Sequence, residues 1–249
     1  MKKAIVLFSA LLLCFGCKAA DRNWTVEIVK EYPHDTESYT QGLFFNDGVL
    51  YESTGQWGKS TFRIVDLKTG KPERKLSYGK KFFVEGSVIL NDQLFVLTWT
   101  NNVAFIYDAN TLEYKQTYRY PREGWGLTTD GKSLIASDGS DRIYWLDEEF
   151  KQEKSIKVTW KGKPLKYLNE LEWIDGKIWA NVYTTDFIAI INPDTGVVEH
   201  LVDCTSLFPA EKRTPKMDVL NGIAYDESTG KLYLTGKYWP KLFEVRIVK

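Results

Sequence analysis

The chain has 249 residues, 43% of them hydrophobic, and its 33 Lys and Arg residues balance 33 Asp and Glu residues. This length suits one large domain or two small ones, with enough apolar material for a core. A net charge of zero argues against a nucleic-acid-binding protein, which normally carries a basic face.

The first residues have the composition of an export signal. Lys2 and Lys3 precede an apolar run, residues 4–15, which ends in Gly16-Cys17. A positive start followed by such a run is typical of a signal peptide, and Gly before Cys resembles the lipobox of bacterial lipoproteins. We therefore expect residues 1–16 to be removed and Cys17 to carry lipid.

The alternative is an ordinary signal peptide cleaved near Ala19-Ala20, because Cys14 stands where a lipobox normally has Leu. Either way we expect a bacterial protein that is exported, periplasmic or anchored to the outer membrane. No later run of about 20 apolar residues follows that could span a membrane. Membrane association is therefore expected only through the lipid.

The remaining cysteine and histidine content excludes several kinds of site. Beyond Cys17, only Cys204 remains, so neither a disulfide within the domain nor a cysteine-based zinc site can form. We expect Cys204 to be a half-buried structural residue. Two histidines, His34 and His200, are too few for a His-rich zinc site and do not stand where a catalytic triad would need one.

Five stretches of the chain repeat one pattern of strand, turn and strand. Each turn is rich in Asn, Asp and Gly, and each second strand is rich in aliphatic and aromatic residues. The stretches are residues 41–55, 85–99, 125–139, 169–183 and 221–237. A third strand follows each of them, and a more polar fourth strand follows most. Four antiparallel strands at a period of about 40 to 52 residues are typical of a β-propeller blade.

The sequence therefore predicts an all-β fold, a five-bladed β-propeller. The fifth unit lacks a fourth strand because the chain ends at Lys249. We expect the alternating segment 24–32 to supply that strand and close the ring, which removes exposed sheet edges. Residues 24–249 would then form a single domain, preceded by a linker, residues 17–23.

Aligning the five units aligns two rings of side chains on one face of the propeller. The first ring is Gln41, Glu85, Trp125, Asn169 and Asn221. The second, fourteen residues later in four units and sixteen in the fifth, is Gly55, Trp99, Gly139, Tyr183 and Lys237. A few polar groups converging among aromatic walls are typical of a small-ligand pocket.

These residue types suit proton-transfer chemistry in a dry pocket. Glu85, beside Phe83, is a carboxylate in an apolar setting, where a raised pKa allows general acid/base catalysis near neutral pH. Lys237 and Asn169 can donate hydrogen bonds to a developing oxyanion. Each residue alone also has a structural explanation, as a turn cap or a core aromatic. The Asp138–Asp141 stretch is read as a turn and not as a calcium loop.

At these residues the chain resembles the plant-type glutaminyl cyclases, a family that also occurs in bacteria. The resemblance covers essentially the whole mature chain. The matching segments are Tyr39–Leu43, Tyr51–Gly55, Glu85-Gly86, Leu97–Trp99, Gly124–Leu127, Ser137–Gly139, Asn169–Glu172, Trp179–Val182, Leu220–Ala224 and Thr235–Lys237 before Trp239-Pro240.

The resemblance implies a five-bladed propeller that converts the N-terminal glutamine of peptides to pyroglutamate and releases ammonia, without catalytic zinc. It implies Glu85 as proton shuttle, with Asn169 and Lys237 stabilising the oxyanion. It implies Gln41, Phe83, Trp99, Trp125 and Tyr183 as the substrate pocket. No cofactor is expected for catalysis, although a structural metal such as calcium in the channel fits the family.

Two positions depart from the family pattern. Val84 stands where the family usually has Gly before the glutamate, and Tyr183 where Trp is common. Both affect the shape of the pocket, and neither removes a charged group. We expect peptides or proteins with N-terminal Gln as substrates, no nucleic-acid partner, and a monomer.

Two other functions are alternatives for such a chain. A non-catalytic propeller lipoprotein that binds peptides or a partner protein would not need Glu85 and Lys237 together. A metal-dependent propeller hydrolase acting on lactones or glycans would need convergent acidic ligands, and the two rings contain a single carboxylate.

Overall fold

The computed structural model describes residues 23–249, which form 22 β-strands and one three-residue 3₁₀ helix, η1 (Ala210–Lys212). Within this range no helix has the length and apolar character needed to cross a membrane. The expected signal peptide, the lipidated Cys17 and all but the last residue of the expected linker lie outside the described residues.

Three four-stranded antiparallel sheets follow one another along the chain. The first contains β2 (Thr40–Asn46), β3 (Val49–Thr54), β4 (Thr61–Asp66) and β5 (Lys71–Ser77). The second contains β6 (Val84–Leu90), β7 (Gln93–Thr98), β8 (Val103–Asp108) and β9 (Tyr114–Arg119). The third contains β10 (Leu127–Thr129), β11 (Leu134–Ser137), β12 (Arg142–Leu146) and β13 (Gln152–Lys157).

The remaining long strands form one eight-stranded sheet with two four-stranded halves. One half contains β16 (Leu168–Ile174), β17 (Lys177–Val182), β18 (Phe187–Ile191) and β19 (Val198–Asp203). The other contains β20 (Leu220–Asp226), β21 (Lys231–Gly236), β22 (Lys241–Val248) and β1 (Trp24–Pro33). The halves join where β1 runs parallel to β19 over Trp24 and Thr25. The expected pairing of the N-terminal strand with the C-terminal unit is confirmed, because β1 is antiparallel to β22.

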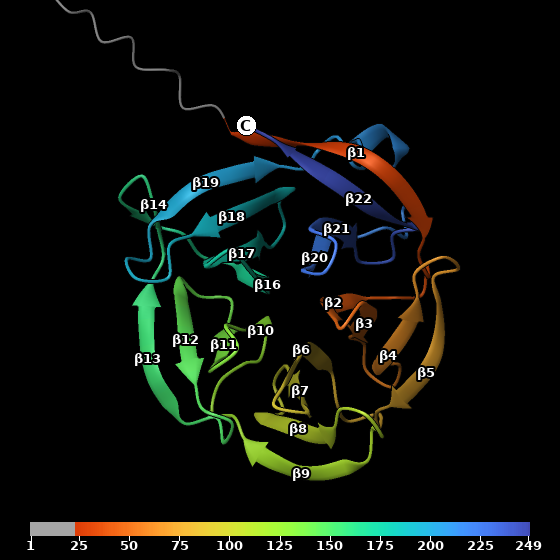
Figure 1. Ribbon diagram of the computed structural model, residues 1–249, viewed down its shortest axis with the longest axis vertical. Coiled ribbons are helices and arrows are strands. Elements are labelled where there is room, and N and C mark those ends of the chain that lie inside the picture. Colours follow the sequence, from red (N-terminus) through yellow and green to blue (C-terminus); the bar gives the residue numbers. More distant parts are fainter. Residues whose placement is uncertain (1–22) are drawn as a thin grey trace, which may run out of the picture.

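The sheets are arranged radially around a central axis (Figure 1). The innermost strands, β2, β6, β10, β16 and β20, contact one another in a closed cycle. These strands are buried along nearly their whole length, whereas outer strands such as β5 and β9 are mostly exposed. The polar character of the fourth strands therefore reflects their place at the rim.

Short turns with positive φ angles join the two inner strands of several sheets. Asp47 and Gly48 between β2 and β3 both have positive φ angles, 50° and 75°. Asn91 and Asp92 do the same between β6 and β7. Two positive φ angles match the twist of a two-residue hairpin, and Asn, Asp and Gly tolerate them best. The turn signals in the sequence thus correspond to real hairpins.

The hydrophobic core lies between neighbouring sheets. One cluster joins Val88 and Leu97 of the second sheet to Leu127 and Leu134 of the third. Cys204 belongs to another cluster and is fully buried, so the expectation of half-burial was wrong in degree. A short hairpin, β14 (Thr159–Trp160) with β15 (Lys163–Pro164), was not predicted from the sequence.

Candidate active site

A pocket of about 180 Å³ opens where the innermost strands begin. It brings together all eight side chains that the sequence and the family resemblance proposed for catalysis or binding. Ten residues line it: Tyr39, Gln41, Gln56, Phe83, Glu85, Trp99, Trp125, Asn169, Tyr183 and Lys237. Tyr39 and Gln56 were not predicted. Asn221 of the first ring is not part of the lining, although it contacts Gln41.

β-Bulges at the start of the inner strands aim the polar side chains. The strand register shifts between Thr40 and Gly42, between Val84 and Ser87, and between Leu168 and Leu171. Gln41, Glu85 and Asn169 lie inside these shifts. A bulge takes a residue out of the regular alternation and redirects its side chain, which is why bulges are frequent at active sites.

Gln41 stands between the acid and the cation of the pocket. Its Nε2 donates to Glu85 Oε1 at 3.0 Å, and its Oε1 accepts from Lys237 Nζ at 2.7 Å. Asn221 Nδ2 donates to the Thr40 carbonyl at 2.9 Å and lies 3.4 Å from Gln41 Oε1, which fixes the amide. Glu85 and Lys237 are thus held near each other without direct contact.

Burial shifts the protonation equilibria of both charged groups toward neutral pH. Burial raises the pKa of Glu85 well above its usual range, opposed by the charge of Lys237 and reinforced by that of Glu123. Burial lowers the pKa of Lys237 to about 8, opposed by Glu85 and Asp218. Perturbed pairs of this kind are characteristic of acid/base sites.

Aromatic rings give the pocket its walls. Phe83 and Trp99 pack edge to face, with ring centroids 5.5 Å apart, and Trp125 packs in the same way on Tyr183 at 5.6 Å. Lys237 Nζ lies 4.4 Å from the centroid of the Tyr39 ring and 5.2 Å from that of Tyr183. These cation–π contacts help to hold an ammonium group in a desolvated place.

Two glycines of the second ring make room for these walls. A Cβ atom on Gly55 would lie 2.2 Å from the Phe83 ring, and one on Gly139 would lie 2.5 Å from the Trp125 ring. A larger residue at either position would push an aromatic ring into the pocket. The small members of the second ring are therefore part of the site, although they carry no functional group.

Glu123 links the two tryptophans at the rim. Its Oε2 accepts from Trp99 Nε1 at 2.8 Å and from Trp125 Nε1 at 3.1 Å. Glu123 was not predicted from the sequence. Its position two residues before Trp125, a first-ring residue, indicates that it lies near the site. Repeat alignment does not identify it, because the alignment compares only the two ring positions of each unit.

Asn169 has hydrogen-bonding capacity left over. The residue is only 2% exposed, and its Oδ1 is buried without a hydrogen-bond partner among the described residues. A buried polar atom without a partner is costly. An unpaired amide oxygen in a pocket lining is suited to a ligand that supplies a hydrogen-bond donor.

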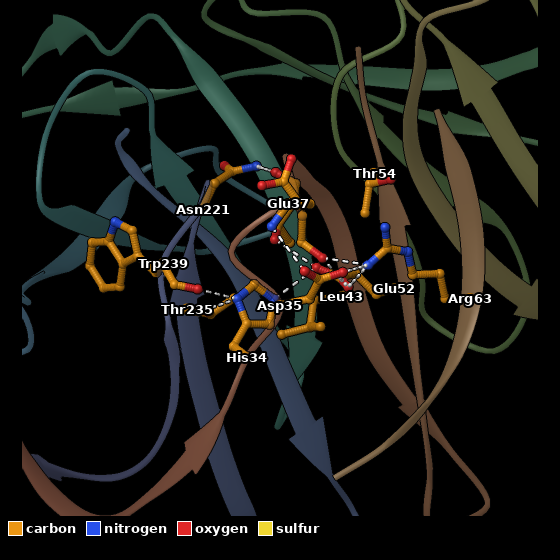
Figure 2. Close-up of polar contacts among 12 residues, drawn as sticks. His34, Asp35, Glu37, Leu43, Glu52, Thr54, Arg63, Asn221, Thr235 and Trp239 are labelled. Carbon is orange, nitrogen blue, oxygen red and sulfur yellow. Dashed lines mark hydrogen bonds and ion pairs between the residues drawn. The ribbon is translucent and has the colours of Figure 1, made fainter. Parts of the chain in front are cut away.

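A buried ionic network joins His34, Glu52 and Arg63 (Figure 2). His34 Nδ1 faces the Trp239 carbonyl oxygen at 2.7 Å, and Nε2 faces Glu52 Oε1 at 2.9 Å. Both partners only accept, so both ring nitrogens must donate and the ring is an imidazolium. Glu52 also accepts from the hydroxyls of Ser38 and Thr40.

This network connects the segments that carry two site residues. Thr40 directly precedes Gln41, and Trp239 follows Lys237 by two residues. Burial alone would lower the pKa of His34, but the charge and hydrogen bond of Glu52 outweigh it, so the pKa is raised. His34 lies outside the pocket lining, as expected, but nothing in the sequence around it predicts this supporting position.

The channel carboxylates do not form a metal site. Glu170 accepts the backbone N–H groups of Leu43 and Ile223, and Glu172 accepts that of Tyr225. Within residues 23–249 no three His, Cys, Asp or Glu side chains converge as a ligand set. The side chains present therefore do not fit the structural metal that the resemblance suggested, and no chemical step is derived through one.

A larger cavity, about 910 Å³, opens at the opposite ends of the inner strands. Acidic hairpin residues, among them Asp47, Asp92 and Asp130, line it. It is larger, but no Lys, Arg, His or Cys accompanies its carboxylates in the lining. The smaller pocket is the better candidate, because its acid, cation and amides converge.

Comparisons with known proteins point to one family. A family model described as glutamine cyclotransferase matches residues 5–247. The glutaminyl-peptide cyclotransferase of Arabidopsis thaliana is 40% identical over 228 residues, which is 89% of this chain and 71% of that protein. The crystal structure of Myxococcus xanthus glutaminyl cyclase matches with a TM-score of 0.84 and 34% identity, covering 90% of this chain and 97% of that one.

A more distant structure shares the fold alone. It is a Bacteroides caccae protein of unknown function, with a TM-score of 0.51 and 12% identity over 68% of this chain and 69% of that one.

Proposed function

The chain belongs to the glutamine cyclotransferase family, and we propose that it cyclises the N-terminal glutamine of peptides and proteins to pyroglutamate with release of ammonia. The observation that carries the mechanism is the Glu85–Gln41–Lys237 arrangement inside an aromatic pocket. It supplies one proton carrier and one cation, held apart by a neutral amide.

The reaction needs one proton to move from one nitrogen to another. The neutral α-amine of the glutamine attacks the side-chain amide carbon, and its nitrogen loses one proton as the new bond forms. A new C–N bond forms, the amide C–N bond breaks, and the amide nitrogen leaves as ammonia after it gains a proton. Glu85 takes the first proton and returns it to the leaving nitrogen, which a carboxyl group with a raised pKa can do near neutral pH.

The other site residues stabilise the intermediate and hold the substrate. Lys237 and Asn169 donate to the oxygen of the tetrahedral intermediate. Phe83, Trp99, Trp125 and Tyr183 enclose the folded glutamine side chain and keep water from competing with the amine. Gln41 positions Glu85 and Lys237, in addition to lining the pocket.

The direct test is ammonia release from a Gln-initiated dipeptide incubated with purified protein. Release that persists in EDTA is expected, because no step involves a metal. If the wild-type protein released no ammonia, the proposal would fail and the non-catalytic peptide-binding protein would replace it. No contact among the described residues favours that alternative, since binding alone does not require a buried carboxyl group beside a buried ammonium.

We extend the proposal to the architecture. Five innermost strands in a closed cycle support a five-bladed propeller, in which the eight-stranded sheet is two blades joined at their outer edges. Residues 24–249 would be a single domain that acts as a monomer. Export, lipidation of Cys17 and a periplasmic or outer-membrane location remain proposals that rest on the N-terminal sequence.

A further inference from the structure

In the proposed reaction the pocket, of about 180 Å³, holds the N-terminal glutamine, whose α-amine and side-chain amide must both reach Glu85. The rest of the peptide continues from the carbonyl carbon of this glutamine toward the mouth of the pocket. The second residue of the substrate must therefore cross the rim, where its side chain meets whatever the rim offers.

The rim offers an aromatic surface that continues outward from the pocket. Trp57 packs on Phe83 with ring centroids 5.7 Å apart and on Trp99 at 6.5 Å. Phe83 and Trp99 line the pocket, but Trp57 does not, and it is 48% exposed. These three rings, called the aromatic shelf below, lead from the pocket wall to solvent.

The loop that carries Trp57 is held in a defined conformation. Gln56 has a φ angle of 105°, a backbone conformation that residues other than glycine rarely adopt. Its carbonyl accepts from Ser60 Oγ at 2.9 Å and from the Lys59 N–H at 3.0 Å. Ser60 Oγ in turn accepts from the N–H of Val84, the residue before Glu85, at 3.0 Å.

Strain of this kind persists where surrounding contacts enforce it, and it is concentrated at functional sites. Here it places Gln56 in the pocket lining and Trp57 on the rim. The loop is also tied to the strand that carries the proposed proton carrier. The exposed Trp57 is therefore held beside the pocket by a defined loop conformation.

We propose that the aromatic shelf of Trp57, Phe83 and Trp99 binds the side chain of the second substrate residue and favours an aromatic one. This inference rests on the proposed function, because it places glutamine in the pocket. Trp57 is the specificity-determining member, since Phe83 and Trp99 also enclose the glutamine. The preferred substrates are then peptides that begin with Gln followed by Phe, Tyr or Trp.

Tyr238 marks the other direction in which a peptide could leave. Its ring packs on Tyr39 of the pocket lining with centroids 5.1 Å apart. However, Lys216 Nζ lies over the Tyr238 ring, 5.8 Å from its centroid, and Lys216 is itself paired with Glu37. Trp57, by contrast, packs on two rings of the pocket lining. Among the described residues, no Lys or Arg side chain lies over the Trp57 ring.

The test compares two dipeptide amides, Gln-Phe and Gln-Gly, by ammonia release. The wild type should show a kcat/KM about two- to tenfold higher for Gln-Phe, the range expected for one aromatic contact. Trp57→Ala should remove this preference by raising KM for Gln-Phe, with kcat and the Gln-Gly reaction little changed. Trp57→Phe should retain part of the preference. Tyr114 is an exposed aromatic residue on outer strand β9, so Tyr114→Ala is the matched control and should keep the wild-type preference.

Calorimetry measures the contribution of the shelf to binding independently of turnover. The affinities of the two amides are compared for Glu85→Gln and for the double variant Glu85→Gln/Trp57→Ala. If wild type released no ammonia from either amide, the proposed function would fall, while the calorimetry would still report on the shelf. Equal losses on both amides in Trp57→Ala, or a loss of preference in Tyr238→Ala instead, would overturn the shelf. A Gln-Phe preference that Trp57→Ala removes and Trp57→Phe partly keeps supports it.

Discussion

At the scale of single residues, the site keeps charged groups where burial opposes them. Glu85 is 5% exposed and Lys237 is 2% exposed, and no direct bond joins them. Burial without a full partner is energetically costly. The cost is consistent with function, because the same burial moves both pKa values toward the pH at which a proton must be exchanged.

Replacing Glu85 by Gln should separate activity from stability. We expect Glu85→Gln to lose at least about 100-fold in kcat, the usual contribution of a general acid/base group. Because the pKa of Glu85 is higher in the folded than in the unfolded state, its ionisation lowers stability progressively as pH rises above 4.5. Thermal unfolding at pH 7 should therefore show Glu85→Gln at least as stable as wild type. Unimpaired turnover would refute the assigned role, and a collapsed fold would refute the energetic argument.

The rim carboxylate Glu123 should tune the proton carrier. Its negative charge contributes to the raised pKa of Glu85 in the free enzyme, so Glu123→Gln should move the acidic limb of the kcat/KM–pH profile to lower pH. The alkaline limb should stay near pH 8, where Lys237 loses its proton. The amide oxygen of Gln can still accept from the indole N–H groups, which keeps the walls in place.

Because Glu123 is exposed, salt should shrink this displacement of the acidic limb. Glu148→Gln, at the opposite end of the inner strands, is the matched control and should leave the profile unchanged. An acidic limb that stays in place at low salt in Glu123→Gln would show that Glu123 acts only on the tryptophans.

At the scale of elements, the bulges at the start of β2, β6 and β16 decide where the polar side chains point. Repeat alignment predicted that Gln41, Glu85 and Asn169 share a face, because equivalent positions of equivalent units do. It did not predict the bulges, since alternation of apolar and polar residues describes regular strands only. Nor did it predict the positive φ angle of Gln56, which nothing in Gly55-Gln56-Trp57 signals.

The ion pair between His34, after β1, and Glu52, on β3, should stabilise the protein within a defined pH window. The pKa of His34 is raised from 6.5, so its contribution is complete below pH 6.5 and is lost as pH rises through the folded-state value. The pKa of Glu52 is lowered from 4.5: burial would raise it, but His34, Arg63 and Thr40 outweigh burial. Its contribution is complete above pH 4.5 and is lost at lower pH.

We therefore expect His34→Gln to lower the free energy of unfolding by about 3 kcal/mol, most strongly between pH 4.5 and 6.5. Urea unfolding at a series of pH values measures this difference. His200→Gln, on outer strand β19, is the matched control. A destabilisation that does not vary with pH would mean that His34 contributes by packing and not by charge.

At the scale of the whole molecule, the strands are joined at the rim and at the centre. At the rim, β1 pairs with β22, which brings the two ends of the described chain into one sheet. This closure followed from the sequence, because the last unit lacked a strand and segment 24–32 lacked a partner. The central contacts did not, because nothing in the segment Asn169–Glu172 signals that the Glu170 side chain reaches other strands.

Glu170 joins three inner strands across the centre of the ring. Four of the five units have glycine directly after the first-ring residue, and the fourth unit has Glu170 instead. Its side chain crosses the channel from β16, so that Oε1 accepts the Leu43 N–H of β2 at 3.2 Å and Oε2 accepts the Ile223 N–H of β20 at 3.0 Å. The glycines instead allow neighbouring inner strands to approach closely, because a Cβ atom on Gly42, Gly86 or Gly126 would lie 2.9, 2.5 or 2.0 Å from a backbone atom of the next strand.

Glu170→Ala should therefore weaken the closed ring as a whole. It leaves two buried backbone N–H groups without acceptors, at about 1–3 kcal/mol each, and it opens a cavity beside Asn169. Glu170→Gln keeps one acceptor oxygen and should fall between wild type and Glu170→Ala in urea unfolding. Glu149→Ala, at an exposed turn, is the control and should match wild type. If Glu170→Ala unfolded at the wild-type urea concentration, the rim pairing of β1 with β22 would be sufficient to hold the ring, and the central carboxyl group would be dispensable for stability.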